Sequence, residues 1–197
     1  MSDSATLAND PVLALLLYLV LPLWLLAGFA DWLCHRRSDI AHTAGMRESL
    51  LHLLMFSEIA VPLLACLFLE INASVFLLIV VCFFLHEATA LWDVSYAGRR
   101  RRITTFEQHV HSFLEILPLA ATLLLAVRHW GQFLAMWGLG QETAEWRLRM
   151  KADPLPAAEV IGILAAAVVM EIIPYLEELW RGWQAGRGAR RRGAAPG

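Results

Sequence analysis

Charged residues are scarce in this sequence of 197 residues, where Asp, Glu, Lys and Arg make up 17%. Soluble domains usually carry about 25% charged residues, and the hydrophobic share of 58% is also above their usual range. No excess of positive charge is present, because 16 Lys and Arg residues face 18 Asp and Glu residues. The sequence therefore argues against a soluble globule, and it excludes a nucleic-acid-binding protein because its basic residues form short clusters rather than one face.

Cysteine is also rare. The three cysteines are Cys34, Cys66 and Cys82, and each falls inside a hydrophobic run. A pair between them would have to form within a hydrophobic interior, whereas secreted disulfide scaffolds place several cysteines in short, loop-rich chains. This pattern excludes a secreted disulfide-stabilised domain.

Long hydrophobic runs are abundant, and a membrane span needs roughly 20 mostly apolar residues. Five stretches meet this requirement, at residues 11–34, 48–70, 73–94, 105–127 and 156–180. We expect the first to remain in the mature protein, because acidic Asp3 and Asp10 precede it where a signal peptide carries basic residues. The sequence predicts an all-α integral membrane protein with one helical domain at residues 1–181, in which the first four spans form a bundle around a polar metal site.

Capping residues support these limits. Asp10 before Pro11 is typical of a helix start, Thr104 and Glu107 have capping-box spacing, and Asn72 can cap the third span. Residues 129–155 mix aromatic and charged side chains without a run long enough to span, which predicts an amphipathic segment on the outer surface. Residues 182–197 are rich in Gly, Ala and Arg and are predicted to be a disordered basic tail.

The distribution of basic residues predicts the orientation, since basic loops are retained in the cytoplasm. Twelve of the 16 Lys and Arg residues flank the first loop, fill the third loop or follow the last span. The other four lie between the fourth and fifth spans. We therefore expect the N-terminus outside and the C-terminus in the cytoplasm, and the Gly-, Ala- and Arg-rich composition suggests the inner membrane of a bacterium.

Ionisable residues within the spans are the most informative feature, because each costs about 2.5–3.5 kcal/mol on insertion scales. Three spans carry a carboxylate and an imidazole four residues apart on one helix face, and a fourth carries them seven apart. These pairs are Asp31 and His35, Glu48 and His52, Glu107 and His111, and His86 and Asp93. Consecutive spans alternate in direction, so all four pairs are predicted to meet at the cytoplasmic side, with Glu87 and His109 as further candidate ligands.

Three more carboxylates lie deeper in the spans. Counting about 1.5 Å per residue, Glu58, Glu115 and Glu171 fall about 15 Å from the cytoplasmic helix ends. Glu115 continues the helix face of Glu107 and His111 by one turn. We interpret these three residues as a second layer of ligands or as a path for protons.

Imidazole and carboxylate ligands without paired thiolates suit iron, manganese or zinc. The ten candidate ligands are too many for one tetrahedral zinc, and inward-facing Glu and His residues hold two metals in other helix bundles. The arginines fall in the loops, so we expect metal cations rather than arginines to neutralise the buried carboxylates. The preferred cofactor is therefore two iron ions, with zinc or manganese as alternatives; whether His42 or Cys34 joins the site stays open.

In ligand type and placement, the set resembles the histidine-rich membrane di-iron hydroxylases and desaturases, which oxidise a lipid chain at the cytoplasmic face. The His-x-x-x-His and His-x-x-His-His boxes of those families do not occur here, and Glu-x-x-x-His stands at residues 48–52 and 107–111 instead. The arrangement is also similar in logic to the four-helix haemerythrin site.

Four functions remain open. The first is a di-iron oxidoreductase that hydroxylates or desaturates a lipid and takes electrons from a partner protein, since no nucleotide-binding loop or haem-attachment motif is present. The second is a zinc-dependent lipid amidase or esterase. The third is a metal carrier or sensor without enzymatic activity. The fourth is a b-type haem protein, which would need only two axial histidines and would leave the carboxylates unexplained.

Overall fold

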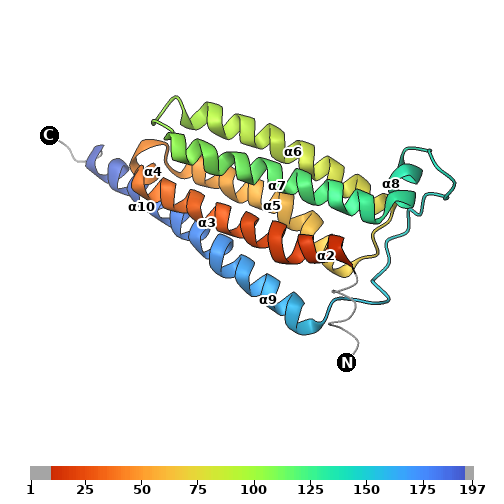
Figure 1. Cartoon of the computed structure of the whole chain (residues 1–197). Helices are drawn as coiled ribbons and strands as arrows, with labels where there is room; N and C mark the ends of the chain where they lie inside the picture. Colours follow the sequence, from red (N-terminus) through yellow and green to blue (C-terminus); the bar gives the residue numbers. More distant parts are fainter. Residues whose placement is uncertain (1–9, 194–197) are drawn as a thin grey trace.

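The fold is a bundle of long helices, seen in a computed structural model that describes residues 10–193 (Figure 1). One isolated antiparallel bridge joins Leu69 to Met150, and the described residues otherwise form helices, turns and loops. Within residues 10–193, five helices are long and apolar enough to cross a membrane, which confirms the five spans predicted from the sequence. They run over Pro11–Arg37, Met46–Phe68, Ala73–Ala97, Thr105–Arg128 and Ala157–Gly188.

The first and last of these helices each contain a π-helical turn. The first consists of α2 (Pro11–Leu15), the π turn η1 (Leu16–Val20) and α3 (Leu21–Arg37). The last consists of α9 (Ala157–Ala167), the π turn η2 (Val168–Ile172) and α10 (Ile173–Gly193). Between them lie α5 (Met46–Phe68), α6 (Ala73–Ala97) and α7 (Thr105–Arg128). A π turn inserts one extra residue into a helix and is frequent at functional sites.

The helix starts follow from the capping residues of the sequence. Asp10 accepts a hydrogen bond from the Leu13 amide at 2.9 Å, and Asn72 accepts one from the Val75 amide at 3.2 Å. Thr104 and Glu107 form a reciprocal capping box at the start of α7. These three predicted caps are confirmed, and each satisfies backbone groups that a helix end would otherwise leave unpaired.

Two short helices lie in the connections. The helix α4 (Ile40–Thr43) joins α3 to α5, and α8 (Trp130–Met136) follows α7. After α8 the chain is mostly irregular up to residue 156, where the sequence predicted one amphipathic segment. This loop is held on the α5–α6 connection by backbone hydrogen bonds of 2.9 Å, from Glu70 to the Arg149 carbonyl and from Lys151 to the Phe68 carbonyl.

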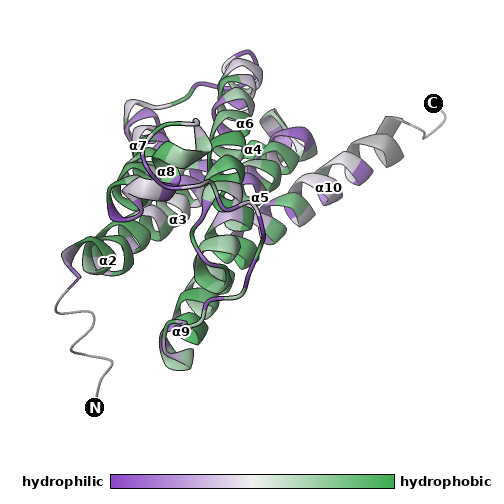
Figure 2. Ribbon diagram, turned by 90° about the vertical axis from the view of Figure 1, so that its right-hand side faces the viewer, coloured by the Kyte–Doolittle hydropathy of each residue, from purple (hydrophilic) through white to green (hydrophobic). Residues whose placement is uncertain are grey.

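The long helices pack as two pairs, α3 on α7 and α5 on α6, and α10 lies against α5, α3 and α4 (Figure 1). Their outward faces are apolar along most of their length (Figure 2). Large hydrophobic side chains are exposed on every long helix, including Leu26, Val61, Leu85, Ile116 and Ile161. An apolar exterior of this kind suits a lipid environment and is compatible with a multi-pass membrane protein.

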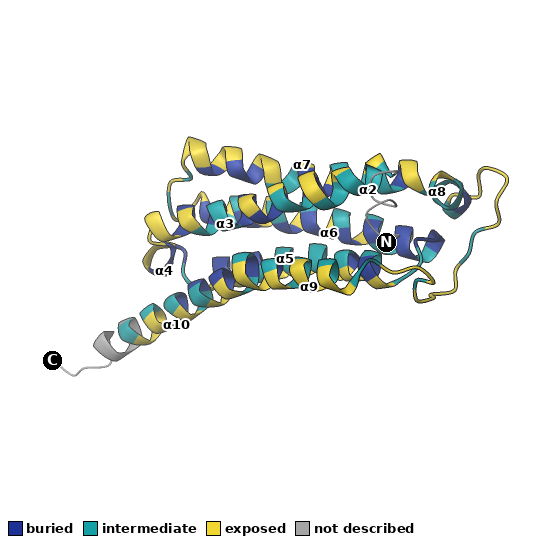
Figure 3. Ribbon diagram, turned by 60° about the horizontal axis from the view of Figure 1, so that its bottom comes forward, coloured by how far each residue is buried: buried dark blue, intermediate teal, exposed yellow. Residues whose placement is uncertain are grey.

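The interior divides into two halves along the bundle axis. Toward α8 it is apolar, with a core that includes Val75, Phe76, Ile79 and Ala126. Toward the α3–α5 and α6–α7 connections it contains buried carboxylates and imidazoles. We call this second half the polar end; in Figure 3, buried residues occur along α3, α5, α6 and α7, whereas α2 has none and α9 has only Ala167.

The end of α10 differs from the sequence prediction. The helix continues to Gly193, although residues 182–197 were predicted to be a disordered tail. Gly182 is buried, because α10 packs closely against the start of α5 at this point. Packing against α5 therefore accounts for the helix at Gly182, and residues 194–197 lie outside the described part of the chain.

Candidate metal centre

The four pairs predicted from the sequence converge at the polar end. Each comes from a different helix, with Asp31 and His35 on α3, Glu48 and His52 on α5, His86 and Asp93 on α6, and Glu107 and His111 on α7. All eight side chains are buried. Buried charged groups without partners are costly, so this cluster requires either internal pairing or bound cations.

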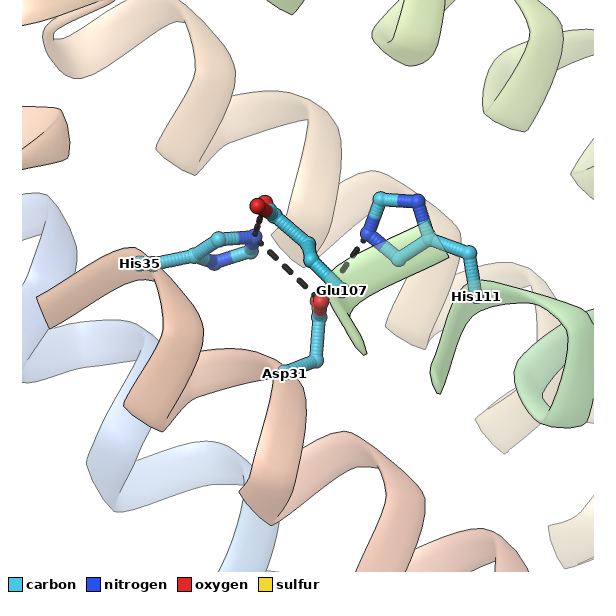
Figure 4. Close-up of side chains that lie close together, drawn as sticks. All are labelled: Asp31, His35, Glu107 and His111. Atoms are coloured by element: carbon cyan, nitrogen blue, oxygen red, sulfur yellow. Dashed lines mark hydrogen bonds and ion pairs between the residues drawn. The ribbon is translucent and has the colours of Figure 1, made fainter. Parts of the chain in front are cut away.

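One group of four can hold a metal ion, namely Asp31, His35, Glu107 and His111 (Figure 4). Nε2 of His35 lies 3.4 Å from Oδ1 of Asp31 and 3.6 Å from Oε1 of Glu107. Nε2 of His111 lies 2.9 Å from the same Asp31 oxygen. Donor atoms around one ion at about 2.1 Å are roughly 3–3.5 Å apart, so these side chains are close to the spacing of a ligand set.

A second group consists of His35, Glu48 and His52, and it shares His35 with the first. Asp93 adds a carboxylate to this group, with Oδ2 at 3.6 Å from Nε2 of His52. The two groups together draw donors from α3, α5, α6 and α7. The candidate site is thus continuous and is larger than the ligand set of one four-coordinate ion.

The imidazoles of His35 and His52 are stacked, with ring centroids 4.2 Å apart and planes 10° apart. Behind them lies Glu178 of α10, which accepts a hydrogen bond from Nδ1 of His35 at 2.9 Å and from Nδ1 of His52 at 2.8 Å. With Nδ1 donating, Nε2 of each ring carries the lone pair. Within the described part of the chain, both Nε2 atoms are buried and lack a hydrogen-bond partner.

This use of Glu178 matches the arrangement in which a metal-binding histidine donates its other nitrogen to a carboxylate. The carboxylate fixes the tautomer and the ring orientation, and it makes the imidazole a stronger ligand. Sequence reasoning missed Glu178. The available signal was its spacing of seven residues from Glu171, which places both carboxylates on one face of the last helix.

Arg101 also enters the site, contrary to the prediction that no arginine faces the buried carboxylates. Its Nε and Nη2 donate to Oε1 of Glu48 at 2.9 and 2.6 Å, and Nη2 lies 2.6 Å from Oε1 of Glu107. Burial opposes the charge of this guanidinium, but hydrogen bonds and charges from Glu107 and Glu48 outweigh burial and raise the pKa of Arg101. The arginine therefore stays charged and neutralises part of the cluster.

A bound metal requires neutral imidazoles, and it would meet an excess of carboxylates. With five ionised carboxylates and one guanidinium, the cluster would then carry four negative charges. The five are Asp31, Glu48, Asp93, Glu107 and Glu178. Unpartnered buried oxygens occur on Glu48 and Asp93 among the described residues. Two divalent cations would balance this charge. Within residues 10–193, the unpartnered Nε2 atoms of His35 and His52 are free to bind them. Nε2 of His111 and Oδ1 of Asp31, in contrast, are hydrogen-bonded to each other in this structure.

A small cavity of about 50 Å³ adjoins the cluster. It is larger than the roughly 10–15 Å³ that one water molecule occupies on this measure. His86 lines the cavity and donates from Nδ1 to the Met55 carbonyl at 3.2 Å, which leaves Nε2 as its lone-pair nitrogen. Glu115 and Glu171 also line the cavity, so two of the three deeper carboxylates lie next to the cluster.

Other sequence candidates lie apart from these groups. His109 is exposed and packs edge-to-face on Phe113 with ring centroids 5.4 Å apart, and Glu87 is half-buried outside both ligand groups. Glu58 accepts a hydrogen bond from Thr89 at 2.9 Å. His42, left open by the sequence, is an exposed residue paired with Asp39 at 2.9 Å. Cys34, also left open, is buried next to His35 but belongs to neither group.

Comparison with known proteins gives no further assignment, because no family model, no curated protein and no solved structure matches this chain. The site therefore has to be interpreted from its own geometry.

Proposed function

We propose that this protein is a membrane-embedded oxidoreductase that holds two iron ions at its polar end and hydroxylates or desaturates a lipid. The observation that carries the proposal is the stacked pair of His35 and His52 on Glu178. Their lone pairs lie on the side of the rings away from Glu178, and the rings are 4.2 Å apart. Two-metal sites place their ions about 3.5–4 Å apart, which fits one ion on each imidazole.

Each ion would then have its own ligands. One would use His35 with Asp31, Glu107 and His111, and the other would use His52 with Glu48 and Asp93. A ligand set of imidazoles and carboxylates without thiolates suits iron, with manganese and zinc as the alternatives. With neutral imidazoles, five ionised carboxylates and one guanidinium would leave four negative charges, which two divalent ions would balance.

When bound, such an iron pair would supply the chemistry of oxygen activation. Hydroxylation converts a C–H bond and O₂ into a C–OH group and water, and it consumes two electrons and two protons. Glu115 and Glu171 line the cavity beside the cluster, so with Glu58 they are the candidates for moving these protons. The electrons would come from an electron-donor protein.

The arginines near the polar end support a location of the site on the cytoplasmic side of the membrane. Arg36, Arg37 and the run from Arg99 to Arg102 lie at the ends of helices that form the polar end. We propose that this end faces the cytoplasm of a bacterium, with the N-terminus outside and the C-terminus inside, because basic segments are retained there. The substrate would then meet the site near the inner leaflet.

The test is the metal content of protein purified in detergent after expression with ⁵⁷Fe. We expect two iron ions per chain and the Mössbauer signature of a coupled pair, which the double variant His35→Ala/His52→Ala should lose. His109→Ala is the matched control, because His109 is an exposed histidine on α7. A single zinc with three protein ligands would favour a zinc-dependent lipid hydrolase instead. Metal-free protein from iron-rich medium would contradict any metal-dependent function.

A further inference from the structure

A second cavity of about 160 Å³ lies in the apolar half of the bundle. Its walls come from the first helix and from α5, α6 and α7. They include Leu17, Leu63, Phe83, Ala121 and Leu125. The hydroxyl of Thr122, also in the wall, already donates to the Pro118 carbonyl at 2.9 Å. The cavity therefore offers apolar contacts and almost no site for a polar ligand.

Backbone irregularities in three helices surround this cavity. Leu16, Leu17 and Val20 of the π turn η1 line it, as do Pro62 of α5 and Pro118 of α7. Proline inside a helix removes one backbone hydrogen bond and displaces the carbonyl four residues earlier, and a π turn widens the helix. Because all three deviations border the same space, the sequence itself opens this cavity.

Trp24 connects this cavity to the metal centre. It lines both the apolar cavity and the small cavity beside Asp31, His52 and His111. Its ring is buried and stacks on Phe56 with centroids 6.2 Å apart. A molecule in the apolar cavity would thus contact Trp24, whose ring also borders the small cavity beside the candidate ligands.

We propose that the apolar cavity binds the hydrocarbon chain of a membrane lipid and presents it to the metal centre past Trp24. This inference rests on the proposed function and adds the site that would hold the chain of the lipid substrate. An engineered cavity of about 150 Å³ with similar walls binds benzene and stays dry, so this cavity accepts about six chain carbons. A polar headgroup would lose its hydrogen bonds there, and the surrounding bilayer supplies hydrocarbon chains.

The test uses a phosphatidylethanolamine with a diazirine in the middle of one acyl chain, incorporated into nanodiscs with the full-length protein. After illumination, we expect labelled peptides to contain cavity residues of α5 and α7 in addition to lipid-facing residues. Ala121→Phe should abolish the cavity label by filling the space. Leu123→Phe is the matched control, because Leu123 is on the same helix but is 57% exposed to the exterior.

A second filling variant, Leu63→Trp on α5, keeps the test decisive if Ala121→Phe does not fold. Label confined to lipid-facing residues, or cavity label unchanged in both filled variants, would overturn the inference. Iron content is measured on the same samples and separates the two proposals. Wild-type protein that retains iron but lacks cavity label contradicts only the lipid-chain site, whereas protein without iron contradicts the proposed function.

Discussion

Glu178 contributes to the site without being one of the candidate ligands. Its two oxygens accept hydrogen bonds from His35 and His52, so one carboxylate orients two rings. The adjacent Glu177 has a different role, since it accepts a hydrogen bond from Trp32 at 3.1 Å and pairs with Arg181 at 2.8 Å. Of these two neighbouring carboxylates on α10, Glu178 therefore positions the imidazoles, and Glu177 lies at the periphery of the site.

The Glu178→Gln variant should bind iron about 10–100-fold more weakly, as is typical when a carboxylate behind a metal-binding histidine is removed. The glutamine has one acceptor oxygen in place of two, so one imidazole loses the hydrogen bond that fixes its tautomer and its orientation. Competition titration against a chelator measures the affinity. Glu177→Gln should bind like the wild type, and equal affinities for both variants would contradict the role of Glu178.

Arg101 joins Glu48 and Glu107, and its side chain is 3% exposed. Removing one partner of a buried ion pair costs about 3–5 kcal/mol, so Arg101→Met should destabilise the metal-free protein on this scale. Bound cations would supply the missing positive charge. The difference in stability between Arg101→Met and wild type should therefore become smaller when metal is added. Thermal unfolding with chelator and with metal measures both effects.

Arg102→Met provides the comparison for this change, because Arg102 is the exposed next residue of the same loop. It should unfold at the wild-type temperature in both conditions. An Arg101→Met protein as stable as wild type without metal would show that the guanidinium does not compensate the buried carboxylates.

At this scale, the sequence predicted the candidate ligands that the structure buries together at positions where helix periodicity determines the direction of a side chain. Asp31 and His35 are four residues apart, as are Glu48 and His52, so both side chains of each pair lie on one helix face. The hydrophobic run around each pair already indicates a long helix. Glu178 lies near the end of an apolar run, where a carboxylate usually faces headgroups. Arg101 is one of four consecutive arginines, and only the tertiary path of the loop determines which one turns inward.

At the scale of elements, α10 positions Glu178 by packing closely on α5. A Cβ on Gly182 would come within 3.0 Å of the Met46 backbone nitrogen and 3.1 Å of its Cα. Glycine is required here by this approach of two backbones rather than by its conformational freedom. Gly182 is one turn beyond Glu178, so the close contact also sets the position of that carboxylate.

Gly182→Val should therefore lower stability by about 1–3 kcal/mol through overpacking, and it should reduce the iron content as α10 moves away. Gly186→Val is the control one turn further along, where an added Cβ would meet open space. Both changes alter helix propensity equally, so only the first should act through packing. Unfolding temperature and iron content are measured for each, and equal losses in both would attribute the effect to propensity alone.

The junction of α7 and α8 predicts a dependence of stability on pH. Burial, with the positive charges of Arg128 and Lys151, lowers the pKa of His129 to about 4 from its ordinary 6.5. The folded state favours the neutral form of His129. Its contribution to the free energy of unfolding is therefore complete above pH 6.5 and is lost as the pH falls toward 4. His129→Gln should lose less stability than wild type between pH 7 and 5, as thermal unfolding at each pH would show. Parallel losses would contradict this.

The elements themselves were largely predictable from the sequence. Five hydrophobic runs and the caps at Asp10, Asn72 and Thr104 define the long helices, because both signals are local. The end of α10 was not, since residues 182–193 have a loop-like composition, and the close contact of Gly182 with Met46 of α5 cannot be inferred from composition. The segment after α8 likewise depends on backbone pairing with residues 68–70, which composition does not reveal.

For the whole molecule, the distribution of polarity is inverted relative to a soluble protein. Apolar side chains such as Leu91 and Phe84 face outward, while carboxylates such as Glu48 and Glu107 are fully buried. The sequence predicted this inversion. Ionisable residues inside a long apolar run cannot face lipid at low cost, so they are expected in the bundle interior. It could not predict the two adjoining cavities, which depend on how the helices pack around Trp24.

His35 and His52 both donate to Glu178, and this shared carboxylate makes the two proposed metal positions interdependent. An ion that binds first orders the imidazole, and through Glu178 its stacked neighbour, so the second ion meets a preformed set of ligands. Titration with less than one equivalent of iron should therefore yield empty and doubly filled chains, with few singly filled ones, and native mass spectrometry would count them. A dominant singly filled form would mean that the positions load independently. Interdependent loading would also make a mixed pair of different metals uncommon, so whichever metal is abundant would occupy both positions.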